Sequence, residues 1–251
     1  MPGVWSWFKQ WFHRWGSPRW FYERSLRWSF WFGLLTAVLL TVGIVWGLGF
    51  AAVDYRQGNS YRIIFIHVPN ASLAMSNYVL MALSGAIGMI WKIKLADWVM
   101  KRAAILGVFF AIAALFTGAV WGKPTWGSWF EWRDPKIQFT LFMLFFYLGI
   151  LALKSSYQNE EMANRFATIL ALVGVVNIPI IYYAAEMFNT LHQTTGTSFS
   201  NVSMRVPFFT MLAAGYCFYA WVLLRSIRAE IIQREYKTQW VKDLLSANKL
   251  G

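Results

Sequence analysis

Six long apolar runs constrain the fold of this chain more than any other feature. They cover approximately residues 30–52, 68–91, 103–121, 138–154, 166–186 and 207–224. A helix needs about 20 predominantly apolar residues to cross a bilayer, and none of these runs alternates apolar and polar residues as membrane β-barrel strands do. The sequence therefore predicts an all-α, polytopic membrane protein with six transmembrane helices.

The amino-acid composition favours a single membrane domain. Hydrophobic residues make up 58% of the chain, against about 45–50% in soluble domains, and the excess is concentrated in the six runs. We divide the chain into an N-terminal interfacial segment (1–29), a six-helix transmembrane domain (30–224) and a charged tail (225–251). The tail is expected to be a solvated helix without chemistry of its own.

The positions of the basic residues predict the orientation. Of the 23 Lys and Arg residues, 17 lie in the N-terminal segment, the second and fourth loops and the C-terminal tail, and 6 lie in the other loops. Because cytoplasmic loops are enriched in Lys and Arg, both termini are expected in the cytoplasm. The loops near 53–67, 122–137 and 187–206 then face outward. This distribution between spans argues against nucleic-acid binding, despite the net charge of +12.

The N-terminal segment has the pattern of a helix lying in the membrane interface. Trp5, Phe8, Phe12 and Trp15 recur at helical spacing with basic residues between them, and Gly16-Ser17-Pro18 is expected to end that helix. The segment is not expected to be a cleavable signal peptide, which would need a short apolar core and a small-residue cleavage site.

The chain has a single cysteine, Cys217, which lies in an apolar run. One cysteine excludes an intramolecular disulfide and C-x-x-C chemistry.

A tryptophan-rich stretch, WGKPTWGSWFEWRD at 121–134, is expected to be an outward loop at the membrane surface. One reading is an aromatic belt, because Trp is enriched at membrane interfaces. The other is the apolar floor of a ligand site, since Gly122 and Gly127 allow close backbone approach or tight turns. The tryptophans are Trp121, Trp126, Trp129 and Trp132.

Two histidines border apolar runs on the same predicted side. His67 lies at the start of the second run, where Pro69 suits a first helical turn, and His192 lies just past the fifth. Neutral imidazoles are good iron ligands, so two of them could bind one iron from opposite faces, as in haem. The plain alternative is a polar residue at the membrane surface. Asp134-Pro135 is a typical helix start, and starting the fourth span does not exclude a second role in positioning the loop.

Haem carries two carboxylates that need cationic partners. The outward cations available for them are Arg62, Arg133, Lys136 and Arg205, and ordinary loop charge explains at least half of these. Several motifs are absent from the sequence, including G-x-x-x-x-G-K-[ST], G-x-S-x-G, H-E-x-x-H and C-x-x-C-H. The chain therefore does not hydrolyse ATP by a P-loop, and haem would not be attached through C-x-x-C-H.

The chain resembles the CcmC family, the haem-handling (haem exporter) proteins C of bacterial cytochrome c maturation. The similarity covers nearly all of the chain outside the N-terminal 29 residues. The stretches that carry it are DYRQGNSYRIIFIHVPNA (54–71), WGKPTWGSWFEWRDPK (121–136), GVVNIPIIYY (174–183) and NTLHQ (189–193). A tryptophan-rich "WWD" loop between two outer histidines is a specific signature of this haem-handling superfamily.

The resemblance implies a non-enzymatic, multi-pass protein of the bacterial inner membrane. His67 and His192 match the family's axial ligands of a non-covalent b-type haem, and the four tryptophans with Asp134 match its tryptophan-rich motif. The implied partners are haem, a periplasmic haem chaperone, an ABC-type ATPase, a permease subunit and a small single-span protein. The function implied is delivery of haem at the periplasmic face.

Some positions depart from the family pattern. The paired tryptophans are Trp129-Phe130 here, Arg133 is an extra residue, and the D-x-R of the motif reads Asp134-Pro135-Lys136. Either Arg133 or Lys136 could therefore contact a propionate.

Two other functions stay open from the residues alone. One is a haem-containing quinol oxidoreductase subunit, which normally holds its ligands deep within the spans. The other is a permease subunit of an ABC transporter.

Overall fold

The computed structural model describes residues 14, 16–193 and 201–247. Their regular secondary structure is helical throughout, with one isolated bridge between Asp54 and Gly58 and no strand. Six segments are long and apolar enough to cross a membrane, which confirms the predicted all-α, six-span class. The expected interfacial helix near Trp5–Trp15 falls almost entirely outside the described residues.

The helices extend beyond the apolar runs that predict them. The first span begins at Pro18, immediately after the predicted break, rather than near residue 30. The spanning elements are α2 (Pro18–Val45) with the π-helical turn η1 (Trp46–Phe50), the 3-10 turn η2 (Asn59–Ile63) with α3 (Ile64–Trp91), α4 (Lys94–Trp126), α5 (Pro135–Ser156), α6 (Glu160–Gly174) with α7 (Asn177–Tyr182), and α9 (Val202–Glu235). Two short helices, α8 (Ala184–Met187) and α10 (Gln239–Ala247), lie outside the spans.

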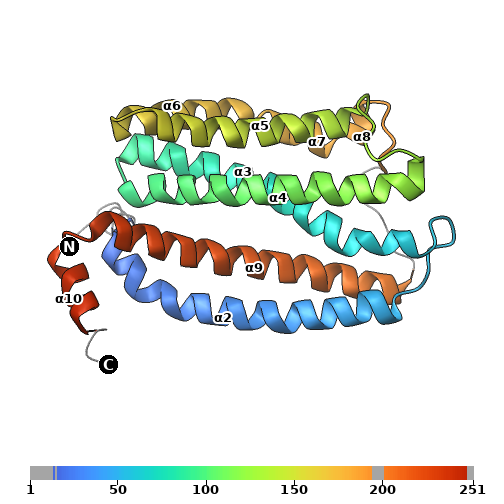
Figure 1. Ribbon diagram of the computed structural model, residues 1–251, viewed down its shortest axis with the longest axis horizontal. Coiled ribbons are helices and arrows are strands. Elements are labelled where there is room, and N and C mark those ends of the chain that lie inside the picture. The colour runs from blue at the N-terminus through green and yellow to red at the C-terminus, as the bar shows by residue number, and fades with distance from the viewer. Residues whose placement is uncertain (1–13, 15, 194–200, 248–251) are drawn as a thin grey trace, which may run out of the picture.

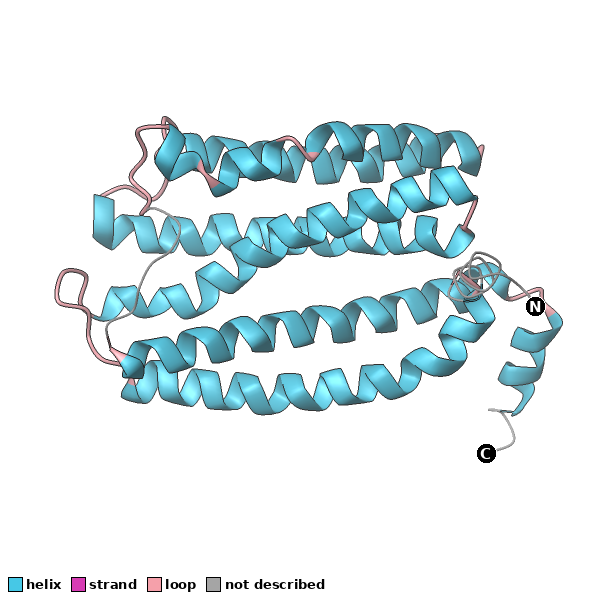
Figure 2. Ribbon diagram, turned by 180° about the vertical axis from the view of Figure 1, so that it is seen from behind, coloured by secondary structure: helices cyan, strands magenta, loops and turns pink. Residues whose placement is uncertain are grey.

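The helices pack as three antiparallel pairs in layers (Figure 1). The α3–α4 pair forms the middle layer, with α5 and α6 on one side and α2 and α9 on the other. The described start of α2 and the helix α10 lie at one end of the bundle. The connections 51–58 and 127–134 and the segment 188–193 lie at the opposite end. The described parts of the three predicted outward loops therefore share one end. Figure 2 shows a break partway along the fifth span, between α6 and α7.

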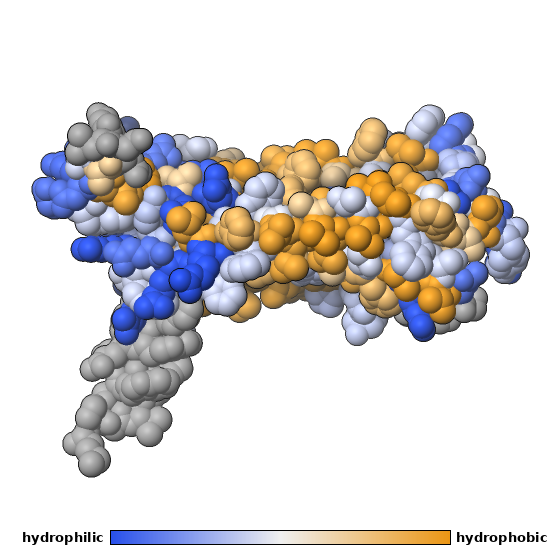
Figure 3. Space-filling view, turned by 90° about the horizontal axis from the view of Figure 1, so that it is seen from below, coloured by the Kyte–Doolittle hydropathy of each residue, from blue (hydrophilic) through white to orange (hydrophobic). Residues whose placement is uncertain are grey.

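Apolar side chains form a wide band between two polar ends of the molecule (Figure 3). Several helices continue past this band. At a rise of about 1.5 Å per residue, the 33 residues of α4 span about 50 Å, more than the ~30 Å hydrocarbon core of a bilayer. Their ends can therefore carry polar groups at the membrane surface, and the predicted site residues gather at such an end.

Close contacts at small residues hold the layers together. A Cβ on Gly107 of α4 would lie 2.1 Å from the Tyr147 ring of α5, so only glycine allows this approach. A buried amide also joins three helices to α3: Asn77 donates to the Ala103 carbonyl and to the Tyr147 hydroxyl, at 2.9 Å each, and accepts from Tyr219 at 2.6 Å. Small residues and interhelical hydrogen bonds are the usual means of helix association in lipid, where burial gives little driving force.

The C-terminal tail differs from the solvated helix expected from its charges. Helix α9 continues to Glu235 and buries Ile227 and Ile231. Glu230 is 0% exposed and forms ion pairs with Lys101 and Arg102 of α4 and with Arg234, one turn further along α9. A buried carboxylate is stable only with such cationic partners, and the pairs with Lys101 and Arg102 fix the end of α9 against α4.

Candidate functional site

The predicted histidines lie in one cavity at the end of the bundle that holds the three outer connections. The cavity has a volume of about 410 Å³, within the range of about 300–1,000 Å³ typical of ligand sites, and it adjoins a smaller one of about 70 Å³. Both are lined by His67, Trp126, Lys136 and His192. The cavity walls otherwise come mainly from apolar residues of α3, α4, α5 and α7.

His67 projects into the cavity from the first turn of α3. Its Nδ1 lies 3.0 Å from the Thr117 hydroxyl of α4, which donates its own hydrogen to the Ala113 carbonyl at 2.6 Å. Because that hydroxyl can then only accept from the imidazole, Nδ1 carries the proton. The Nε2 lone pair of His67 is left available for a ligand.

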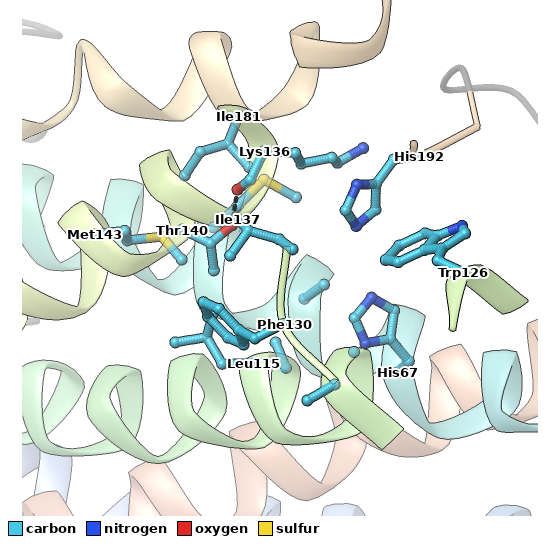
Figure 4. A pocket seen from close by; sticks show the side chains of 15 residues that line it. His67, Leu115, Trp126, Phe130, Lys136, Ile137, Thr140, Met143, Ile181 and His192 are labelled. Carbon is cyan, nitrogen blue, oxygen red and sulfur yellow. Dashed lines mark hydrogen bonds between the residues drawn. The ribbon is translucent and has the colours of Figure 1, made fainter. Parts of the chain in front are cut away.

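His192 reaches the cavity from the segment after α8, and its side chain is 20% exposed. Its Nδ1 lies 3.2 Å from a carboxylate oxygen of Asp134 and 3.2 Å from the Thr190 hydroxyl, which itself donates to Asp134 at 2.5 Å. Both neighbours of Nδ1 are acceptors, so this nitrogen also carries a proton and Nε2 keeps its lone pair. Figure 4 shows one ring nitrogen of each imidazole pointing toward the other across the cavity.

Asp134 joins two parts of the site through its two carboxylate oxygens. Oδ1 accepts from the backbone N–H groups of Lys136 and Ile137 and thereby caps α5, as the Asp-Pro pair predicts. Oδ2 accepts from the Thr190 hydroxyl and from the Leu191 N–H at 2.8 Å. This residue is only 3% exposed. It therefore anchors the His192 segment to the start of α5.

The hydrogen bonds of Asp134 keep its carboxylate ionised. Burial raises the pKa of this carboxyl, but the hydrogen bonds from His192, Thr190 and Leu191 outweigh burial and hold the pKa well below its ordinary value. A carboxylate that accepts from the second nitrogen of a histidine fixes the tautomer and orientation of the ring, and it raises its basicity as a metal ligand. Asp134 is therefore a positioning residue for His192.

The tryptophans divide into two groups, which corrects the expectation of a loop beginning at residue 121. Helix α4 continues through Pro124 to Trp126, so Trp121 and Trp126 are helical. Pro124 is tolerated because it lies in the last turn of α4, where its missing N–H costs only one backbone hydrogen bond. In the same turn, the Thr125 hydroxyl donates to the Trp121 carbonyl. The connecting loop is confined to residues 127–134.

Trp121 and Trp126 are the two tryptophans that line the cavity. Trp126 contacts the His192 ring edge-on with ring centroids 4.9 Å apart, and Trp121 contacts the His67 ring in the same manner at 5.6 Å. The Trp121 Nε1 donates to the Gln57 side chain at 2.7 Å. In contrast to the continuous aromatic floor we expected, Trp129 and Trp132 are 58% and 66% exposed and do not line the cavity.

The two predicted glycines both serve the turn at the end of α4. Gly127 has φ +81°, a left-handed conformation that ends the helix and that residues with a Cβ adopt only with strain. A Cβ on Gly122 would lie 3.1 Å from both the Ser128 carbonyl and the Trp126 ring. Gly122 thus allows the loop to fold back on α4 and helps to hold Trp126 beside the histidines.

The four candidate cations occupy different environments. Lys136 lines the cavity together with both histidines. Arg62 does not line it, because its guanidinium donates to the carbonyls of Leu48 and Ala51 at the end of the first span. Arg133 and Arg205 are exposed and lie outside the cavity walls. Of the two cations that the sequence left open for a propionate, Lys136 is the one at the cavity.

Thr117, Thr190 and Gln57 have positioning roles that sequence reasoning missed. A threonine in an apolar helix usually bonds to the preceding turn, as Thr117 does, so its second bond to His67 leaves no mark in the sequence pattern. Thr190 and Gln57 lie in stretches that carry the family resemblance, which was the available signal. Phe130, beside the tryptophans, also lines the smaller cavity.

The donor set suits a metal that brings ligands of its own. Within the described residues, no group of three or more His, Cys, Asp or Glu side chains is placed to hold a metal ion. Two opposed imidazoles with free Nε2 lone pairs can complete the coordination of a metal that is already bound in a flat macrocycle. Apolar walls and one cation match the remaining parts of such a ligand.

Comparisons with known proteins identify the family. A family model described as Heme exporter protein C matches residues 11–242. Heme exporter protein C of Escherichia coli (strain K12) is 41% identical over 217 residues, which cover 86% of this chain and 88% of the relative. The protein of that name from Haemophilus influenzae is 39% identical over 247 residues, covering 96% and 99%. The one from Bradyrhizobium diazoefficiens is 35% identical over 213 residues, covering 83% and 80%.

Bacterial relatives and six apolar spans together identify a multi-pass protein of the inner membrane. The family match covers all six spans and the whole cavity. The chain therefore belongs to the heme exporter protein C family.

Proposed function

We propose that this protein binds haem at the periplasmic face of the inner membrane and delivers it to a periplasmic haem chaperone for c-type cytochrome biogenesis. The observation that carries the proposal is the pair of Nε2 lone pairs, on His67 and His192, that face one apolar cavity. The relatives' name, heme exporter protein C, supports the same cargo. The protein performs no turnover chemistry in this account.

The residues at the cavity fit a b-type haem. His67 and His192 would bind the iron from its two faces, and Trp121 and Trp126 would pack against the porphyrin edge or face. Lys136 would pair with a propionate carboxylate. Haem supplies the remaining four nitrogen ligands of the iron, which explains why two histidines suffice.

Delivery requires a site that can release its cargo. His192 lies on the segment after α8, outside the spanning helices, and it is held mainly by its contacts with Asp134, Thr190 and Trp126. His67 is fixed within α3. We propose that the His192 side opens to hand haem to the chaperone while His67 retains it until transfer. An ABC-type ATPase, a permease subunit and a small single-span protein are the further partners proposed.

The experiment is complementation in a bacterium that lacks its own copy of this protein. Wild-type, His67→Ala and His192→Ala proteins are expressed to equal levels, and covalent haem in c-type cytochromes is measured on haem-stained gels. His13→Ala, which removes the third histidine of the chain, is the matched control. We expect both site variants to abolish maturation and the control to support it. Normal maturation with both site histidines removed would refute the proposal.

A further inference from the structure

A second cavity lies at the opposite end of the bundle, where α2 begins and α9 leaves the apolar band. It has a volume of about 560 Å³ and is lined by Trp20, Glu23, Arg24, Arg27, Trp28 and Leu224. None of these residues belongs to the haem site. Its walls combine polar and apolar side chains from the start of α2 with Leu224 of α9.

The two arginines give this cavity a net positive charge. Arg24 and Arg27 are three residues apart on α2, which places them on neighbouring positions of one helical face. Glu23 also lines the cavity, and its carboxylate is paired with Arg19 at 2.9 Å. Within the described part of the chain, no ion pair joins Arg24 or Arg27 to a carboxylate, so the two guanidinium groups remain available to an anion.

An aromatic side chain, Trp20, contacts one of these two cations at the boundary of the apolar surface. The Arg24 guanidinium lies 4.9 Å from the centre of the Trp20 ring, and Arg14 approaches the same ring at 5.8 Å. Trp28 is 60% exposed one turn further along α2, beside the apolar residues of the span. Tryptophan prefers the headgroup level of a bilayer, so the arginines lie at that depth.

Arg228 joins α9 to α2 next to Ser25, which lines the cavity. Arg228 of α9 stacks on Tyr22 with its guanidinium 3.8 Å from the ring centre, and it donates to the Tyr22 carbonyl and to the Ser25 hydroxyl. Further along the pair, Gly33 allows the Trp221 side chain to approach α2, since a Cβ there would lie 3.0 Å from it. Arg228 is therefore used within the protein, which leaves Arg24 and Arg27 for a ligand.

We propose that this cavity binds the headgroup of an anionic phospholipid. The phosphate would bridge the two guanidinium groups, which match it in charge and bidentate geometry. The acyl chains would follow the exposed apolar side chains of α2 and α9 next to Trp28 and Leu224. A free phosphate shares the headgroup chemistry but would gain nothing from this apolar surface.

The test compares the full-length protein with an Arg24→Gln/Arg27→Gln variant, using native mass spectrometry with phosphatidylglycerol or phosphatidylcholine. We expect wild type to retain phosphatidylglycerol in preference to phosphatidylcholine. Since each basic residue near a charged membrane surface contributes a factor of about five, the double variant should bind phosphatidylglycerol roughly 30-fold more weakly. An Arg24→Lys/Arg27→Lys variant, which keeps both charges, should recover most of the binding.

An Arg225→Gln/Lys242→Gln variant is the matched control, because it removes two exposed charges from the same end of the molecule but outside the cavity. It should bind phosphatidylglycerol like wild type. Equal loss in this control, or equal retention of the two lipids by wild type, overturns the proposal. Displacement of phosphatidylglycerol by millimolar inorganic phosphate would instead identify a phosphate site and would also overturn it. Unchanged thermal melting of each variant establishes that it is folded.

Discussion

Thr117 and Asp134 place the proton of each site histidine on Nδ1. Thr117 accepts from His67, and Asp134 with Thr190 accepts from His192. Each histidine therefore presents Nε2 to the cavity, although the supports are a neutral hydroxyl in one case and a carboxylate in the other. Because the carboxylate strengthens its imidazole as a donor, the two sides of the site differ in strength.

Replacing Thr117 by valine should weaken haem binding by about 10- to 100-fold, the usual effect of losing the partner that orients a metal-ligating histidine. Valine keeps the shape but cannot accept from Nδ1. Thr117→Ser keeps the acceptor and is the control, expected to bind within a few-fold of wild type. Haem dissociation kinetics of the purified proteins measure the difference. Equal dissociation from the valine and serine variants would contradict the assigned role.

Replacing Asp134 by asparagine should separate its two roles. Asparagine still caps α5 through its amide oxygen, but it carries no charge for His192, and its amide nitrogen cannot accept from Thr190 and Leu191. We expect haem retention to fall by about 10- to 100-fold, with a smaller loss of melting temperature than in Asp134→Ala. Asp134→Ala loses the cap as well and should cost about 1 kcal/mol of stability in addition. Parallel titrations of haem binding and thermal melting compare the two variants. Equal melting temperatures for the alanine and asparagine variants would refute the capping role.

The lowered pKa of Asp134 fixes the direction of its pH dependence. A carboxyl whose pKa is depressed on folding stabilises the protein fully above its unfolded pKa of about 3.9, and this contribution is lost as the pH falls through the lower folded pKa. In a His192→Ala background, where no imidazole lies beside this carboxyl, the difference in melting temperature between proteins with Asp134 and with Asp134→Ala should therefore be constant from about pH 5 to pH 8. A difference that shrinks within this range would contradict the ionised, hydrogen-bonded carboxylate.

At the scale of elements, the sequence predicts the number and kind of helices but not where α4 ends. Asp134-Pro135 predicts the start of α5 because capping is local chemistry. The end of α4 depends on the fold of the loop against Gly122, a contact that sequence spacing does not contain. For this reason the pattern does not indicate that Trp126 lines the cavity while Trp129 and Trp132 are exposed and do not line it.

The contact between α4 and α5 provides a test at this scale. Gly107→Ala should force α5 away from α4 through Tyr147 and destabilise the protein by about 1–3 kcal/mol, as overpacking does. Gly49→Ala, with no atom within 4 Å of the added Cβ, is the control. Thermal melting in detergent should show a lower midpoint for Gly107→Ala alone. Equal midpoints for the two variants would exclude a close helix contact at Gly107.

At the scale of the whole molecule, the distribution of Lys and Arg predicts that the cavity with His67 and His192 faces the periplasm. The fold places the site and the described ends of the chain at opposite ends of the bundle, which agrees with six spans. The meeting of His67 and His192 was predictable only because both adjoin spans expected to end on the same side. The supporting contacts of Thr117 and Gln57 arise from tertiary packing and needed the fold.

Cysteine labelling tests this orientation. In a Cys217→Ser background, Arg133→Cys in the 127–134 loop should react with a membrane-impermeant maleimide added to spheroplasts. Lys237→Cys, between α9 and α10 at the other end, should react only after the membrane is permeabilised. The reverse pattern would mean that the site opens to the cytoplasm and that delivery to a periplasmic chaperone is impossible.

The most direct test of the whole account is the absorption spectrum of the purified protein with haem, in the oxidised and reduced states. Two imidazoles on one iron predict a six-coordinate, low-spin spectrum for wild type. His67→Ala and His192→Ala should each give a five-coordinate, high-spin spectrum or lose haem, whereas His13→Ala should match wild type. A low-spin spectrum that persists in both site variants would show that these histidines do not hold the iron together.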